Sequence, residues 1–148
     1  MRILLAVDGS KYSDAAAEAV MAQAQPAHSE VRVLHVVESP SLLATREMGG
    51  YGSALDKAWE AEREQAEALV EKTAELLRAK GLKATPVVEE GDPKSKILDA
   101  AKKWRAELIV LGSHGRKGLQ HFLIGSVSEA VARHADCSVE VVRLRTKH

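Results

Sequence analysis

Apolar residues occur along the chain in five short, nearly continuous runs, separated by longer segments in which they recur at helical spacing. The runs cover residues 3–7, 31–37, 83–88, 108–111 and 138–144. Short apolar runs of this kind are typical of parallel strands that are buried on both faces. Strands that alternate with helices at this spacing predict an α/β fold with a single open, mostly parallel five-stranded sheet and helices on both faces, which is a Rossmann-like arrangement.

The helical segments carry start and stop signals. Ser10 follows a turn and predicts the N-cap of the first helix. Asp92 and Pro93 have the pattern of an N-cap followed by proline at the first helical position. A long helix is predicted over about 54–80, and Gly81 supplies its C-terminal stop.

The predicted long helix has one apolar stripe that should face the sheet. The stripe consists of Leu55, Trp59, Ala66, Leu69, Val70, Thr73, Leu76 and Leu77. On the solvent side, opposite charges stand three residues apart at Glu60–Arg63 and Glu75–Arg78. Residues 39–53, before this helix, contain one proline and three glycines and predict a long flexible loop, a candidate lid.

Length, charge and cysteine content limit the class of protein. The 148 residues predict a single domain, 1–148. The balance of 21 basic and 21 acidic residues argues against a nucleic-acid partner. Cys137 is the only cysteine, so no intramolecular disulfide can form. The opening apolar run is too short for a signal peptide and no run has the length of a membrane span, which predicts a cytoplasmic protein without a membrane partner.

The segment after the fourth apolar run contains the clearest candidate chemistry. Gly112, Gly115 and Gly125 are spaced G-x2-G-x9-G, and Ser126 then begins a helix predicted over 126–134. Glycines let the backbone approach an anion closely, and the first free amides of a helix point at it. The spacing is neither the dinucleotide fingerprint nor a Walker A loop. From the residues alone, two interpretations stay open: a phosphate site, or a tight structural connection.

Three segments at or near the carboxyl ends of predicted strands should meet at one rim of the sheet. They are Asp8–Gly9, His35–Val36 and Gly112. Ligands of open α/β sheets bind beyond the carboxyl ends of the strands, where the strand order reverses. These segments, far apart in the sequence, therefore predict one crevice.

Taken with the glycine motif, these segments resemble the universal stress protein family, in its ATP-binding branch. The resemblance covers nearly the whole chain: the first strand and acidic turn at 3–10, the second strand at 34–37, the block 107–115 and the last strand at 137–142. It implies the adenine nucleotide alpha hydrolase-like variant of the fold. It also implies bound ATP, with Mg²⁺ or Mn²⁺ held through the phosphates rather than by a set of protein ligands.

The family's binding residues can be placed position by position. The resemblance implies that adenine lies against Ala6 and Val36, with Asp8 beside the adenosine; some relatives have proline in place of Ala6. The ribose and phosphates would contact the glycine loop, at Gly112, Ser113, His114, Gly115, Arg116, Lys117 and Gly118. The phosphates would rest on the start of the last helix, at Gly125, Ser126, Val127 and Ser128. Free amides and two serine hydroxyls are suitable donors there.

Several residues also have a purely structural interpretation. Asp8 either contacts the ligand or its metal, or forms an Asx turn with its own backbone. Arg116 and Lys117 either screen a triphosphate or are solvated loop cations. His35 is interpreted as packed or capping. Cys137 is expected to be a packed residue and not a nucleophile.

We therefore expect an ATP-binding universal stress protein that acts as a nucleotide-responsive cytoplasmic regulator in a stress response and is not a dedicated enzyme. The alternative is a protein-interaction adaptor of the same fold without physiological nucleotide. A third class, an adenylyl-transferring ligase, is disfavoured because its His-Ile-Gly-His or Ser-Gly-Gly-x-Asp-Ser signature does not occur. The resemblance implies a homodimer through the last strand, Ser138 to Leu144, although Glu140 and Arg143 as edge charges would favour a monomer.

Overall fold

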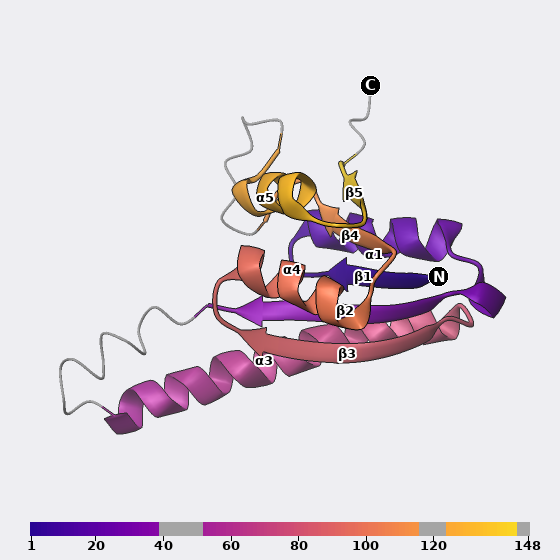
Figure 1. Ribbon diagram of the computed structural model, residues 1–148. Helices are drawn as coiled ribbons and strands as arrows, with labels where there is room; N and C mark the ends of the chain where they lie inside the picture. The colour runs from indigo at the N-terminus through magenta and orange to yellow at the C-terminus, as the bar shows by residue number, and fades with distance from the viewer. Residues whose placement is uncertain (39–51, 116–123, 145–148) are drawn as a thin grey trace.

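A parallel five-stranded sheet with helices on both faces organises the chain (Figure 1). The computed structural model describes residues 1–38, 52–115 and 124–144. The elements are β1 (Arg2–Ala6), α1 (Lys11–Gln23), the short 3₁₀ helix η1 (Pro26–His28), β2 (Glu30–Val37), α3 (Gly52–Ala79), β3 (Lys83–Glu90), α4 (Pro93–Trp104), β4 (Leu108–Gly112), α5 (Ser126–His134) and β5 (Ser138–Val142). The predicted α/β class is confirmed, and every strand pair is parallel.

The strand order places the switch point of the sheet beside β1. The order is β3-β2-β1-β4-β5, so the chain moves outward from β1 to β3 and then returns to add β4 and β5 on the other side. The chain segments that follow the neighbouring strands β1 and β4 therefore lead in different directions. A crevice at the carboxyl ends of such strands is where ligands of open α/β sheets bind.

Two hydrophobic cores lie on opposite faces of the sheet. Side chains that alternate along β1 supply both, because Leu5 packs with the core under α1 and α3 whereas Leu4 packs with the core under α4 and α5. Ile109 and Val110 divide in the same way. All four side chains are buried, which explains why the strand sequences are continuously apolar instead of alternating.

The predicted helix signals act as expected, with one addition. The Ser10 hydroxyl accepts a hydrogen bond from the Ser13 amide, and the Asp92 carboxylate accepts one from the Ser95 amide. Gly81 has φ of 85°, the left-handed conformation that suits a C-terminal stop. Arg105 takes the same conformation after α4, with φ of 60°, although no glycine marks that stop in the sequence.

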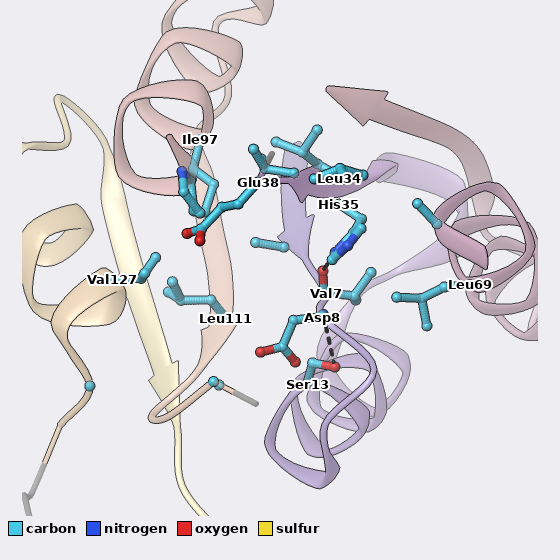
Figure 2. A pocket seen from close by; sticks show the side chains of 18 of the residues that line it. Val7, Asp8, Ser13, Leu34, His35, Glu38, Leu69, Ile97, Leu111 and Val127 are labelled. Carbon is cyan, nitrogen blue, oxygen red and sulfur yellow. Dashed lines mark hydrogen bonds between the residues drawn. The ribbon is translucent and has the colours of Figure 1, made fainter. Parts of the chain in front are cut away.

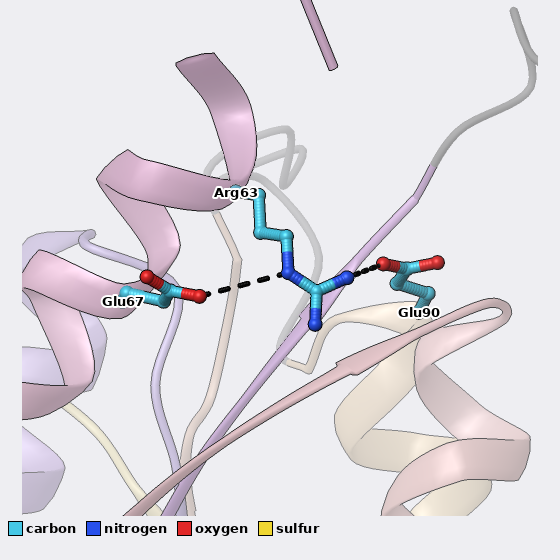
Figure 3. A network of polar contacts seen from close by, with 3 residues as sticks. All are labelled: Arg63, Glu67 and Glu90. Carbon is cyan, nitrogen blue, oxygen red and sulfur yellow. Dashed lines mark hydrogen bonds and ion pairs between the residues drawn. The ribbon is translucent and has the colours of Figure 1, made fainter. Parts of the chain in front are cut away.

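The charged face of α3 is paired differently from the prediction. Figure 3 shows Arg63 between Glu67 on the same helix and Glu90 at the end of β3. Arg78 likewise pairs with Glu71 and not with Glu75. The Arg63–Glu90 pair joins α3 to the carboxyl end of the sheet, and spacing within one helix cannot reveal such a contact.

The structure also corrects the predicted burial of one residue and the boundaries of several elements. Leu76 was predicted to face the sheet, but it is 50% exposed and is not part of the buried stripe. The strand predicted over 83–88 continues to Glu90, and the last strand ends at Val142 instead of Leu144. The long helix begins at Gly52, and the rest of the loop predicted over 39–53 lies outside the described residues. Within the described residues, no helix has the length and apolar character needed to span a bilayer.

Candidate functional site

A cavity of about 580 Å³ opens at the carboxyl ends of β1, β2 and β4 (Figure 2). On the α4–α5 face its wall is apolar and is formed by Ala6, Leu34, Val36, Ile97, Leu111 and Val127. We call this part the apolar lobe. On the opposite face, Leu69 of α3 lies near Val7 and His35, and Ala66 of the same helix also lines the cavity. The volume lies in the range of small-molecule and cofactor sites.

The edge of β2 at Val36 is left open where β1 ends. The β1–β2 register stops at Ala6 and Leu34, followed by one bond from the Val7 amide to the Leu34 carbonyl at 2.9 Å. Val37 bonds the other way, since its carbonyl accepts from the Gly91 amide at 3.0 Å. Backbone groups alternate in direction along a strand, so the N–H and C=O of Val36 face the side from which β1 has departed. They therefore lie at the wall of the apolar lobe.

The N-terminus of α5 forms the second half of the site. Its N-cap is Gly125, which makes no side-chain capping bond. The Gly125 amide donates to the Ser113 carbonyl at 2.6 Å, while the Glu129 amide closes the first helical bond to Gly125. The amides of Ser126, Val127 and Ser128 lie before that bond, at the positive end of the helix dipole, and these residues line the cavity. An anionic group placed there would be stabilised.

Ser128 has a different role from the one predicted for its side chain. Its hydroxyl is buried and donates to the Gly112 carbonyl at 2.6 Å. The hydroxyl therefore ties α5 to the end of β4 and is already committed as a donor. Ser126 is exposed at the cavity, so of the two serine hydroxyls it is the one suited to contact a phosphate.

Packing within the protein restricts the three motif glycines to different degrees, and Gly112 most severely. A Cβ on Gly112 would lie 2.7 Å from the carbonyl carbon and the Cβ of Tyr12 in α1. A Cβ on Gly115 would lie 2.9 Å from Asp8 Oδ2, and one on Gly125 would lie 3.1 Å from the Ser113 carbonyl oxygen. At Gly112 the missing side chain makes room for helix α1, although the residue also lines the cavity. The interpretation of the loop as a tight connection is confirmed, and the loop also borders the cavity; the phosphate site stays a prediction.

Asp8 and the histidines satisfy local bonds while they border the cavity. Asp8 Oδ1 accepts from the Ser10 amide at 3.0 Å, which is the predicted Asx turn, and Asp8 also lines the cavity. His35 Nδ1 bonds the Val7 carbonyl at 2.7 Å, which confirms a capping role. His114 is buried, with Nδ1 3.1 Å from the Ser113 hydroxyl and its ring 5.0 Å from that of Tyr12.

The charge of the described wall is negative. Asp8, Glu38 and Glu62 line the cavity, and no lysine or arginine does so within the described ranges. No group of three or more His, Cys, Asp or Glu side chains in those ranges could hold a metal ion. A divalent cation would thus depend on the phosphates of a ligand for most of its coordination. The predicted contacts Arg116, Lys117 and Gly118 lie outside the described residues.

Most predicted site residues that the structure describes do meet at the cavity. Those lining it are Ala6, Asp8, Val36, Gly112, His114, Gly115, Gly125, Ser126, Val127 and Ser128. Ser113 does not line it and instead holds the loop through its carbonyl. Sequence reasoning missed Ile97, Pro93 and the α3 residues. Ile97 sits one turn into α4, and its placement after the Asp92–Pro93 start beside the rim was the available signal.

Cys137 fits the predicted packed role. It is partly buried against the core under α4 and α5. Burial raises the pKa of its thiol, which lowers the fraction of reactive thiolate near neutral pH.

An open parallel sheet with a cavity at its switch point, bounded by a glycine loop and a helix N-terminus, defines a Rossmann-like α/β protein. The model of the Universal stress protein family matches residues 1–143, and the chain belongs to this family. It is 30% identical to universal stress protein YxiE of Bacillus subtilis (strain 168), over 96% of this chain and 98% of that protein.

Solved structures share the whole fold. Hypothetical protein MJ0577 has a TM-score of 0.85 and 26% identity, covering 99% of this chain and 97% of that one. Two more distant structures contain a nucleotide. One is a universal stress protein in complex with cAMP (TM-score 0.65, 19% identity, 97% of this chain and 96% of that one). The other, from Arabidopsis thaliana, has AMP bound (TM-score 0.67, 20% identity, 99% of this chain and 93% of that one). At these identities the likeness shows the fold.

Proposed function

We propose that this chain binds an adenine nucleotide, ATP accompanied by Mg²⁺ or Mn²⁺, and acts as a nucleotide-responsive cytoplasmic regulator. The observation that carries the proposal is the continuity of one cavity from the apolar lobe to the amides of Ser126, Val127 and Ser128. A planar base suits the first part and phosphate suits the second. The nucleotides bound by two other proteins of this fold support the same class of ligand.

The open strand edge favours adenine as the base. Val36 offers one backbone donor and one acceptor side by side, and adenine carries the complementary pair, N1 and the N6 amino group. Ala6 and Ile97 would cover the faces of the ring. In this arrangement the ribose would lie between Asp8 and the glycine loop.

Binding is tested by isothermal titration calorimetry with Mg-ATP, together with analysis of nucleotide released from the denatured purified protein. The variant Ile97→Trp fills the apolar lobe and should abolish the heat of binding. Asp99→Trp is the matched control, since Asp99 is exposed on the same helix and does not line the cavity. If the wild type binds neither ATP, ADP, AMP nor cAMP, the proposal fails and the adaptor function takes its place.

We also propose that the protein is not a dedicated ATPase. Phosphoryl transfer needs cations around the transferred group, and the described wall of the cavity supplies carboxylates instead. Phosphate release from Mg-ATP should therefore remain at the rate of a protein-free blank. Multiple turnovers within minutes would contradict this part of the proposal.

A homodimer through β5 is the expected assembly. The sheet has two edges, and β3 carries Pro86 whereas β5 has no proline. The Val142 carbonyl bonds inward to the Ser113 amide, so the N–H of Val141 faces the open edge. Val141→Pro would remove that donor and leave the ladder to β4 in place. Light scattering should show a dimer for the wild type and a monomer for this variant; a monomeric wild type would contradict the proposal.

A further inference from the structure

Where the β1–β2 ladder stops, a side chain occupies the carbonyl that the next backbone bond would use. In a parallel pair the bond after Val7 N–H to Leu34 C=O would run from the Val36 amide to the Val7 carbonyl. No such backbone bond joins these two described residues. The Val7 carbonyl instead accepts a hydrogen bond from His35 Nδ1 at 2.7 Å.

The position of His35 makes this bond possible. Its side chain is half-buried on the face of the sheet covered by α3, opposite the side chain of Val36. Figure 2 shows the ring next to Val7, with the dashed bond directed back to the Val7 carbonyl. Because a carbonyl only accepts, Nδ1 is the donor of this bond.

We infer that His35 is a positioning residue that keeps the backbone of Val36 available to read a 6-aminopurine. By holding the Val7 carbonyl, the imidazole prevents the ladder from advancing by one bond, which would consume the Val36 N–H. This inference rests on the proposed function, because it assigns the base selectivity of that same site. His35 does not touch the ligand in this role and acts through Val7 and Val36.

The polarity of this edge distinguishes adenine from hypoxanthine. Adenine presents an acceptor at N1 and a donor at N6, whereas hypoxanthine presents a donor at N1 and an acceptor at O6. With the phosphates anchored at the start of α5, the base cannot turn over to exchange the two groups. The wild type should therefore bind ATP about tenfold more tightly than ITP, the effect of two neutral hydrogen bonds.

The test measures the ratio of ATP to ITP affinity in wild type, His35→Ala and His35→Asn, at fixed Mg²⁺. The ratio should fall toward one in His35→Ala. It should be retained in His35→Asn, because the amide nitrogen of asparagine can donate from nearly the same position as Nδ1. Affinity for inorganic tripolyphosphate should change less than twofold in both variants. His134→Ala, which removes an exposed histidine at the end of α5, is the control and should leave the ratio unchanged.

A measurement on the wild type alone tests the inference even if the variants do not fold. The Val36 amide should exchange with deuterium faster than the Leu34 amide without ligand and become protected when ATP binds. An equal loss of ATP, ITP and tripolyphosphate affinity in His35→Ala, or a Val36 amide already protected without ligand, overturns the role of His35 while nucleotide binding stands. A wild type that binds neither nucleotide overturns the proposed function and this inference together.

Discussion

The Ser128 hydroxyl donates a 2.6 Å hydrogen bond to the carbonyl oxygen of Gly112. The two residues stand at opposite ends of the glycine segment, Gly112 as the last residue of β4 and Ser128 in the first turn of α5. Both are buried. The bond therefore fixes the helix N-terminus relative to the sheet, and with it the amides that would receive phosphate.

Replacement of Ser128 by alanine should lower the free energy of unfolding by about 1–2 kcal/mol, because the variant leaves a buried carbonyl without this donor. Ser126→Ala is the matched control: its hydroxyl is exposed two residues earlier in the same helix, and the free energy should change by less than about 0.5 kcal/mol. Urea unfolding followed by circular dichroism measures both. Equal changes in the free energy of unfolding would show that the bond to Gly112 does not stabilise the fold.

Two glycines of the same motif should respond differently to alanine. In Gly112→Ala the new Cβ meets the backbone of Tyr12 at 2.7 Å, which cannot move without α1, so stability should fall by about 2–3 kcal/mol. In Gly115→Ala the Cβ meets only the carboxylate oxygen of Asp8, at the end of a side chain. That variant should stay within about 0.5 kcal/mol of wild type.

Nucleotide affinity should fall in Gly115→Ala even though its stability is nearly that of wild type. Asp8 must move to accommodate Gly115→Ala, and Asp8 lines the cavity, so affinity should fall although the fold is kept. Thermal unfolding and calorimetry on both variants supply the comparison. Full affinity in Gly115→Ala would show that Asp8 has no part in binding.

The strands and the rim of the sheet could be predicted because their signals are local. Continuous apolar runs mark doubly buried strands, and residues at or just after the end of a run lie at the carboxyl edge of the sheet. Asp8, Val36 and Gly112 meet there. The packing partner of Gly112 could not be predicted in this way. A glycine after a strand is compatible with a ligand or with a neighbouring helix, and only the position of Tyr12 decides between them.

Contacts between distant elements could not be predicted. Leu76 has the spacing of the apolar stripe yet is exposed, because helical period gives a direction but not the width of the surface that covers it. Arg63 pairs with Glu90, a contact that depends on where α3 crosses β3. The bond from His35 to the Val7 carbonyl likewise depends on strand register, which the pattern of residues does not specify.

The N-cap of α4 should make stability depend on acid pH. The Ser95 amide, and then the Ser95 hydroxyl, hold the pKa of Asp92 below its ordinary value by hydrogen bonding to the carboxylate. A depressed folded-state pKa contributes stability that is complete above the unfolded pKa and is lost as the pH falls below about 4. Asp92→Ala should cost about 1 kcal/mol at pH 7, with a smaller difference from wild type in acid.

Asp92→Asn separates the charge from the cap. Asparagine caps helices as well as aspartate does, so the variant should nearly match wild type at pH 7 while lacking the carboxylate that titrates. Melting temperatures between pH 7 and pH 3 should therefore fall less steeply for Asp92→Asn than for wild type. Parallel curves for the two proteins would mean that other carboxylates account for the acid sensitivity.

Removal of divalent cations should weaken ATP binding far more than AMP binding. Asp8, Glu38 and Glu62 line the cavity, and the described wall contributes no lysine or arginine, so a triphosphate without Mg²⁺ would be repelled. Calorimetry in EDTA should show a loss of about tenfold or more for ATP and less than about threefold for AMP, which carries fewer charges. Glu62→Gln should recover part of the ATP affinity in EDTA and have little effect in Mg²⁺. Equal losses for ATP and AMP would indicate that the cation supports the protein and not the phosphates.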